Sequence, residues 1–213
     1  MPLKKPLKII EKNKKIGIKK IEIEGNTTIP DWKLKLAMKD TKQRSILRIF
    51  KRSKFTESTY EKDKLAILEK FNAIGYRDAT IKMDTVYKLD EKNLIIQLSI
   101  DEGNKYYFGN IEWIGNSKFK TSYLDTVLGI KRGDVFNKSL LDQRLNSSQD
   151  GRDITSIYMD RGYLFFRVVP VETNVSNNYI NYQMRVMEGK EARVNRIIIK
   201  GNTKSQKTFS FIR

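Results

Sequence analysis

Three stretches of the chain share one pattern of apolar and polar positions. In each, large apolar residues stand two apart and a glycine-asparagine pair follows. The pairs are Gly25-Asn26, Gly115-Asn116 and Gly201-Asn202, at intervals of 90 and 86 residues. A two-residue period is typical of a half-buried strand, and Gly-Asn is typical of the turn that ends one. The pattern predicts the same strand and turn three times.

Two further landmarks recur in the same order. Gly75-Tyr76 returns as Gly162-Tyr163 after 87 residues, and Glu102-Gly103 returns as Glu188-Gly189 after 86. Agreement of three landmarks in order and spacing indicates an internal duplication, and a unit of this size can bury its own core.

The duplication divides the chain into four parts. Residues 18–105 and 106–191 form two full repeats. Residues 1–17 are a basic lead-in or the end of a preceding repeat, and residues 192–213 are the incomplete start of a further one. Both ends therefore look cut from a longer protein.

Periodicity within the first repeat predicts the order strand, helix, helix, strand, strand. The expected elements are a strand over 18–24, a helix capped by Asp31, a helix over 57–74, and a hairpin of strands over 79–87 and 94–100. Ile81, Met83, Thr85 and Tyr87 are expected on one face of the first hairpin strand. Gly75 stands where a left-handed residue should end the long helix.

The second repeat predicts the same order. Its expected elements are a strand over 111–115, a helix over 121–128, a helical region over 138–161 interrupted at Gly151, and strands over 164–172 and 179–186. Pro170 cannot donate to a sheet, which favours an edge position for its strand. The short aromatic connection between the repeats predicts a semi-rigid pair.

The amino-acid composition excludes most kinds of catalytic site. The chain has neither histidine nor cysteine, so the usual general base, zinc ligand and thiolate nucleophile are missing. No phosphate-binding glycine loop is present. We therefore expect no enzyme activity, no cofactor and no metal site.

The net charge of +17 raises the question of an anionic partner. The basic stretch after the first helix contains Arg44, Arg48, Lys51 and Arg52, which are candidates for contact with phosphates or lipid headgroups. A solvated connection explains the same residues, and we favour that interpretation.

One glycine pair suggests nucleic acid instead. Strand, helix, helix, strand, strand is also the core of a KH domain, which clamps RNA with a Gly-x-x-Gly loop. Gly129 and Gly133 occupy that place in the second repeat, but their spacing is one residue too long and the first repeat has no counterpart. We favour a helix-ending turn, so nucleic acid is not an expected partner, although a KH-like RNA-binding tandem repeat and a passive spacer stay open as alternatives.

Taken together, the Gly-Asn, Gly-Tyr and Glu-Gly landmarks resemble those of consecutive POTRA domains of the BamA family, in the versions found in Bacteroidetes-like bacteria. The resemblance spans residues 18–202. It implies an α+β fold of tandem repeats, each a three-stranded mixed sheet covered by two helices. The repeats are similar to the third and fourth domains of that family.

The resemblance also implies a function. It predicts the periplasmic scaffold portion of an outer-membrane protein assembly factor, at the cell outer membrane, with a signal peptide and a carboxy-terminal β-barrel outside these residues. The expected partners are unfolded outer-membrane proteins and assembly lipoproteins, bound to the edge strand that contains Ile81, Met83, Thr85 and Tyr87. As a fragment the chain is expected to be monomeric.

Overall fold

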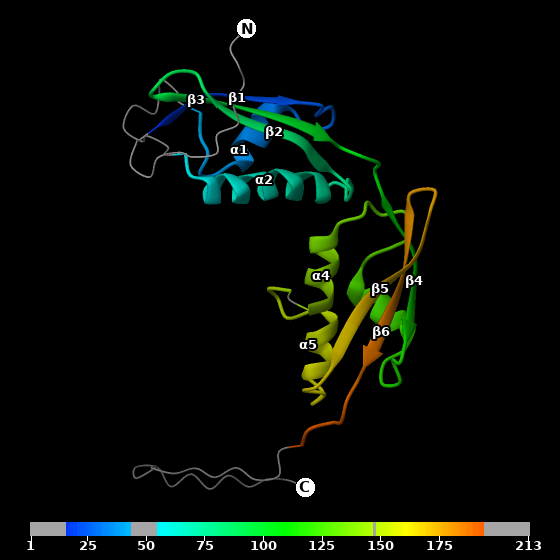
Figure 1. The fold of residues 1–213 in the computed structure, drawn as a ribbon. Coiled ribbons are helices and arrows are strands. Elements are labelled where there is room, and N and C mark those ends of the chain that lie inside the picture. Colours follow the sequence, from blue (N-terminus) through cyan, green and yellow to red (C-terminus); the bar gives the residue numbers. More distant parts are fainter. Residues whose placement is uncertain (1–15, 44–54, 147, 194–213) are drawn as a thin grey trace, which may run out of the picture.

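The computed structural model describes residues 16–43, 55–146 and 148–193. These residues form two units, each built around its own three-stranded sheet (Figure 1). The basic residues Arg44, Arg48, Lys51 and Arg52 lie outside the described part, as do most of the two terminal segments. Among the described helices, none is long and apolar enough to cross a membrane.

Unit one follows the predicted order of elements. It contains β1 (Gly17–Glu24), α1 (Asp31–Ala37), α2 (Glu57–Asn72), β2 (Thr80–Lys88) and β3 (Asn93–Asp101). The sheet order is β1-β3-β2, with β1 parallel and β2 antiparallel to β3. Central β3 buries every second residue, as its strict apolar alternation predicts.

Unit two repeats this topology. It contains β4 (Tyr107–Ile114), α3 (Thr121–Leu128), α4 (Lys138–Asn146), α5 (Ile154–Met159), β5 (Arg167–Ser176) and β6 (Tyr179–Met187), with the sheet order β4-β6-β5. The predicted interruption is confirmed, because Gly151 adopts a φ of +66° between α4 and α5. The second helix of this unit is thus two shorter helices.

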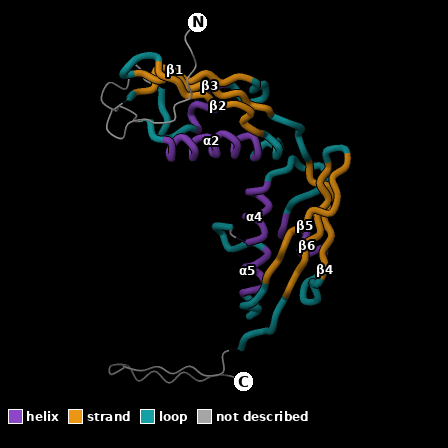
Figure 2. Tube along the Cα trace, viewed as in Figure 1, coloured by secondary structure: helices purple, strands orange, loops and turns teal. Residues whose placement is uncertain are grey.

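Helices cover one face of each sheet and leave the other face open (Figures 1 and 2). The core of unit one joins β1 and β3 to α1 and α2 through Ile21, Ile96, Leu34 and Phe71. The core of unit two is richer in aromatic residues, with Tyr158 stacked on Phe166 at a centroid distance of 3.9 Å. The predicted α+β fold of tandem mixed sheets is therefore confirmed.

Some local expectations were wrong. Asp31 does not cap α1, because Pro30 stands at the cap and Asp31 begins the helix, where its Oδ1 accepts a hydrogen bond of 2.9 Å from Asn26 Nδ2. The first strand of the second hairpin starts later than predicted. Residues 164–166 form a turn after Gly162, in which the Phe166 amide donates to the Tyr163 carbonyl at 3.0 Å.

A β-bulge corrects the predicted face of β2. Ile81 pairs with Ile100, but Met83 pairs with the next residue, Ser99, so Lys82 has no counterpart on β3. An extra residue reverses the alternation of side chains beyond it. Ile81 and Val86 therefore pack on the core, whereas Met83, Thr85 and Tyr87 lie on the opposite face. The periodicity of apolar residues along β2 cannot reveal such a bulge, because a bulge is defined by the pairing of β2 with β3.

The two units meet at a junction with defined contacts. The Tyr106 amide donates to the Gly75 carbonyl at 2.8 Å, and the Arg77 guanidinium bonds the Glu172 carboxylate at 2.7 Å. The same guanidinium lies 4.7 Å from the centroid of the Tyr106 ring. The first hydrogen bond has an equivalent at the far end of unit two, where the Ala192 amide donates to the Gly162 carbonyl at 2.8 Å.

Candidate functional site

The Gly-Asn turns bring the end of the first strand against the last strand of each unit. Gly25 has a φ of +82°, and a Cβ atom there would lie 2.1 Å from the Ile100 carbonyl oxygen. Asn26 holds the following loop, because its Nδ2 donates to the Ile29 carbonyl at 2.8 Å. Only glycine fits the first position, since both the backbone angle and the space exclude a side chain.

Glu102, from the Glu-Gly landmark, receives this loop. Its carboxylate accepts hydrogen bonds from the amides of Thr27 and Thr28 at 2.6 and 2.7 Å and from their hydroxyls at 2.9 and 2.7 Å. The Thr28 hydroxyl oxygen also lies within hydrogen-bond distance of the Tyr76 hydroxyl, at 3.1 Å. The three landmarks of unit one, far apart in sequence, therefore meet at one end of its sheet.

Those donors set the ionisation of Glu102. Burial opposes the charged form, but the hydrogen bonds from Thr28 and Thr27 outweigh it and hold the pKa of Glu102 below its ordinary value. The carboxylate is a charged structural anchor at neutral pH.

Unit two repeats the arrangement, but the tyrosine that joins it comes from helix α5. Gly115, with a φ of +90°, lies with its Cβ position 2.3 Å from the Val186 carbonyl oxygen, and the Asn116 Nδ2 donates to the Phe119 carbonyl at 3.0 Å. Glu188 accepts the Lys118 amide at 2.8 Å. Here Tyr158 on α5 donates its hydroxyl to Glu188 at 3.1 Å, and Tyr163 packs edge-on against the Tyr158 ring.

The open edge of unit one is β2. It pairs with β3 on one side and has no strand partner on the other among the described residues. Met83, Thr85 and Tyr87 line the outer face along this edge, opposite Ser99, Gln97 and Ile95 of β3. Met83 is half exposed, at 52%. An unpaired edge of this kind offers backbone donors and acceptors to an extended segment.

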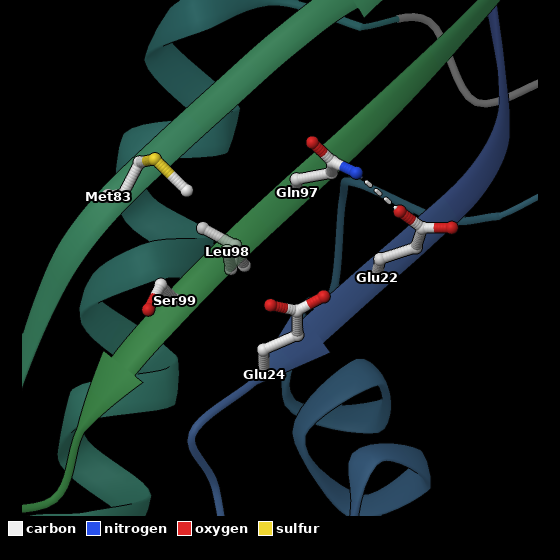
Figure 3. A pocket seen from close by; sticks show the side chains of 6 residues that line it. All are labelled: Glu22, Glu24, Met83, Gln97, Leu98 and Ser99. Atoms are coloured by element: carbon white, nitrogen blue, oxygen red, sulfur yellow. Dashed lines mark hydrogen bonds between the residues drawn. The ribbon is translucent and has the colours of Figure 1, made fainter.

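A shallow hollow of about 160 Å³ lies beside that edge on the outer face (Figure 3). Met83 stands on one side of it, and Glu22 and Glu24 stand on the other. Glu22 is held by Lys20 at 2.7 Å and by Gln97 Nε2 at 2.7 Å, and these bonds lower the pKa of the Glu22 carboxyl. The hollow therefore combines an apolar wall with a negatively charged one.

On the core side, the edge is tied to α2. Lys64 forms an ion pair with Asp84 of β2 and a second one, of 2.8 Å, with Glu61. Burial lowers the pKa of Lys64, but its hydrogen bonds with Asp84 and Glu61 outweigh this and raise the value overall. The pair with Asp84 joins β2 to α2.

The edges formed by β1 and β5 are less open than β2. On β1, the Ile21 amide donates to the Gln43 side chain at 3.3 Å, which covers part of that edge. Strand β5 stands at an edge as Pro170 predicted, yet Pro170 lacks an amide hydrogen. Its Glu172 is already bound by Arg77 and by the Tyr182 hydroxyl.

The glycines that suggested an RNA clamp have structural roles. Gly129 ends α3 in the left-handed conformation, with its amide donating to the Asp125 carbonyl at 2.9 Å. The Gly133 amide donates to the Phe108 carbonyl at 2.8 Å. An amide bound in this way is not free to hold a phosphate, so the geometry favours the helix-ending turn.

Sequence reasoning located the landmarks but missed the contacts between them. It did not identify Glu102 and Glu188 as receptors of the Gly-Asn loops, or the bulge at Lys82. A signal existed for the first, because Thr27-Thr28 and Ser117 supply donors directly after each Gly-Asn pair. Nothing in the sequence indicated that Gln43 would cover β1.

The order of elements and the sheet topology define a tandem of small β-α-α-β-β domains. The POTRA family model, described as "Surface antigen variable number repeat", matches residues 16–103 and 106–189. The chain belongs to this family.

Similar proteins of known name are consistent with membership of this family. The outer membrane protein assembly factor BamA of Neorickettsia risticii is 26% identical over 201 residues, which cover 93% of this chain and 26% of the relative. BamA of Neisseria meningitidis is 26% identical over 123 residues, covering 55% of this chain and 15% of the relative. The chain spans about a quarter or less of the length of these curated relatives.

A solved structure shares the fold. The crystal structure of Haemophilus influenzae BamA POTRA3-5 aligns with a TM-score of 0.56 and 19% identity, covering 89% of this chain and 73% of that one.

Proposed function

We propose that this chain is part of the periplasmic scaffold of an outer-membrane protein assembly factor, and that β2 binds extended segments by strand addition. The open edge of β2 carries the proposal. Relatives whose names describe outer-membrane protein assembly support the wider setting. Unfolded outer-membrane proteins and assembly lipoproteins are the partners that this setting supplies.

Edge pairing suits a scaffold that handles many clients. Backbone hydrogen bonds depend little on the sequence of the added segment, whereas alternate side chains contact whatever lies on each face. On the outer face these contacts are Met83, Thr85 and Tyr87, with the hollow close by. Segments with an apolar or aromatic residue opposite Met83 should bind best, because that side chain gains apolar contact.

The test is an amide NMR titration with an extended peptide from an outer-membrane barrel, at roughly 0.15 M salt so that loose charge attraction is screened. We expect shifts concentrated on Thr80–Lys88 and little change on β5. Two matched peptides, N-methylated at odd or at even positions, serve as the control. Successive amides of an added strand point to opposite sides, so one of the two should bind and the other should not.

Equal binding of both N-methylated peptides would contradict strand addition and indicate recognition by side chains. Shifts confined to Lys39–Gln43 that vanish at higher salt would indicate loose anion binding. A peptide that shifts no amide at any concentration would leave the chain as a passive spacer.

A further inference from the structure

Helix α1 carries an apolar pair that the core does not use. Trp32 and Leu36 are 61% and 70% exposed, and they lie four residues apart on one side of the helix. Leu34 and Ala37 on the other side are buried and attach α1 to the core. Two large apolar side chains in solvent on so short a helix need a reason other than folding.

The second repeat shows that the fold does not require them. In α3 the equivalent positions are Ser122 and Thr126, and the Thr126 hydroxyl donates to the Ser122 carbonyl at 2.8 Å. The core residue of the same helix is unchanged, since Leu124 is buried as Leu34 is. The apolar pair is therefore present in unit one and absent from unit two.

Ammonium groups flank the pair at both ends. Lys33 Nζ lies 5.4 Å from the centroid of the Trp32 ring, and Lys42 Nζ lies 3.3 Å from the Leu36 carbonyl oxygen. The loop before Lys42 is fixed, because the buried Asp63 carboxylate accepts the Lys39 amide at 2.7 Å. Asp31, the residue before Trp32, is already bound by Asn26 and Lys35.

We propose that this α1 face, defined by Trp32, Leu36, Lys33 and Lys42, binds the surface of an anionic phospholipid membrane. An indole ring prefers the boundary between headgroups and acyl chains, and lysines beside it attract lipid phosphates. Two apolar side chains are far too few for a stable protein interface, which buries about 800 Å² on each partner. They suffice for a weak surface contact that orients a domain near a membrane.

Intrinsic fluorescence tests this proposal because the chain has only two tryptophans. Trp113 is 9% exposed and donates to Asp125, so a Trp113→Phe background leaves Trp32 as the reporter. Vesicles of phosphatidylethanolamine with phosphatidylglycerol should shift Trp32 emission to shorter wavelength and carry the chain into the pellet. Vesicles of phosphatidylcholine should do neither. The double variant Trp32→Ser with Leu36→Thr, tested in the chain that keeps Trp113, should bind anionic vesicles about tenfold more weakly.

A matched control is Leu65→Ser, which removes another exposed leucine, 61% accessible, from α2. It should leave vesicle binding unchanged, and circular dichroism should show that all variants stay folded. Undiminished binding by the double variant would overturn the proposal, as would pelleting without a Trp32 shift. Emission already at short wavelength before vesicles are added would show that another part of the chain covers the face, and would overturn it too. Peptide binding at β2 is measured without lipid, so either proposal can fail alone.

Discussion

Glu102 shows how one side chain organises a POTRA unit. It accepts two amides and two hydroxyls from the loop after the Gly25-Asn26 turn, and so joins the end of β3 to the end of β1. Glu188 has the same task in unit two with fewer donors from the loop and one from Tyr158. The Glu-Gly landmark is therefore half of a contact whose other half is the Gly-Asn loop.

Replacement of Glu102 by glutamine should lower the free energy of unfolding of unit one by about 1.5–3 kcal/mol at neutral pH. The glutamine side chain carries no charge, and its NH2 group is a donor facing the donors of Thr27 and Thr28. Urea denaturation, monitored by hydrogen exchange of the Ile96 and Leu98 amides, measures the free energy of unfolding. Glu91→Gln, in an exposed hairpin loop, is the control and should have no effect.

The same variant has a predictable pH dependence. The pKa of Glu102 is lower in the folded protein than the ~4.3 of an unfolded glutamate, so its stabilising effect is complete above that value and is lost as the pH falls through the folded pKa. The difference in stability between the wild type and Glu102→Gln should therefore shrink in acid. A constant difference down to about pH 3 would contradict this role of the charge.

At the scale of elements, the bulge in β2 decides what the open edge presents. Because Lys82 is inserted opposite no residue of β3, the outer face displays Met83, Thr85 and Tyr87 while Ile81 and Val86 remain in the core. The exposed row of the proposed strand-addition site thus depends on one extra residue.

Deletion of Lys82 should leave unit one folded, with less than about 1 kcal/mol lost, because Ile81 and Met83 then alternate naturally and each residue keeps its face. Only the exposed ion pair of Lys82 with Asp101 disappears. Deletion of Gln97 from β3 is the contrasting control. It turns part of the buried row toward solvent, at about 1.5–3 kcal/mol for each core side chain, and should unfold the unit. Amide NMR spectra distinguish the two outcomes, and a disordered spectrum for the Lys82 deletion would refute the role of the bulge.

At the scale of the whole molecule, specific contacts in the described part of the chain join the two units. Arg77 bonds Glu172 across the junction and stacks on Tyr106, whose amide is bound by Gly75. The predicted semi-rigid connection agrees with these contacts. Single substitutions at these contacts should change the range of inter-unit angles.

Arg77→Ser should broaden the distribution of inter-unit orientations while the stability of each unit changes by less than about 0.5 kcal/mol. A partly exposed ion pair contributes little to folding, but it restricts the angle between the two units that it joins. Residual dipolar couplings and small-angle X-ray scattering measure the orientation. The control is Arg152→Ser, at an exposed loop away from the junction. Identical couplings in the wild type and Arg77→Ser would show that the connection alone sets the angle.

The sequence by itself determined the duplication, the order of elements and the family. These follow from local chemistry: apolar periodicity, a glycine at each left-handed turn, and a proline that excludes its strand from a sheet centre. Gly75 and Gly151, for example, have the positive φ angles that their positions predicted.

Only the tertiary structure decided which parts of those elements are available to partners. The face of each β2 residue depends on a bulge defined by pairing with β3, and the cover on β1 comes from Gln43, 22 residues away from Ile21. The exposure of Trp32 and Leu36 was settled by which side of α1 meets the core. Local patterns record the preferences of neighbouring residues, whereas exposure depends on contacts between residues that are distant in sequence, and local patterns do not reveal those contacts.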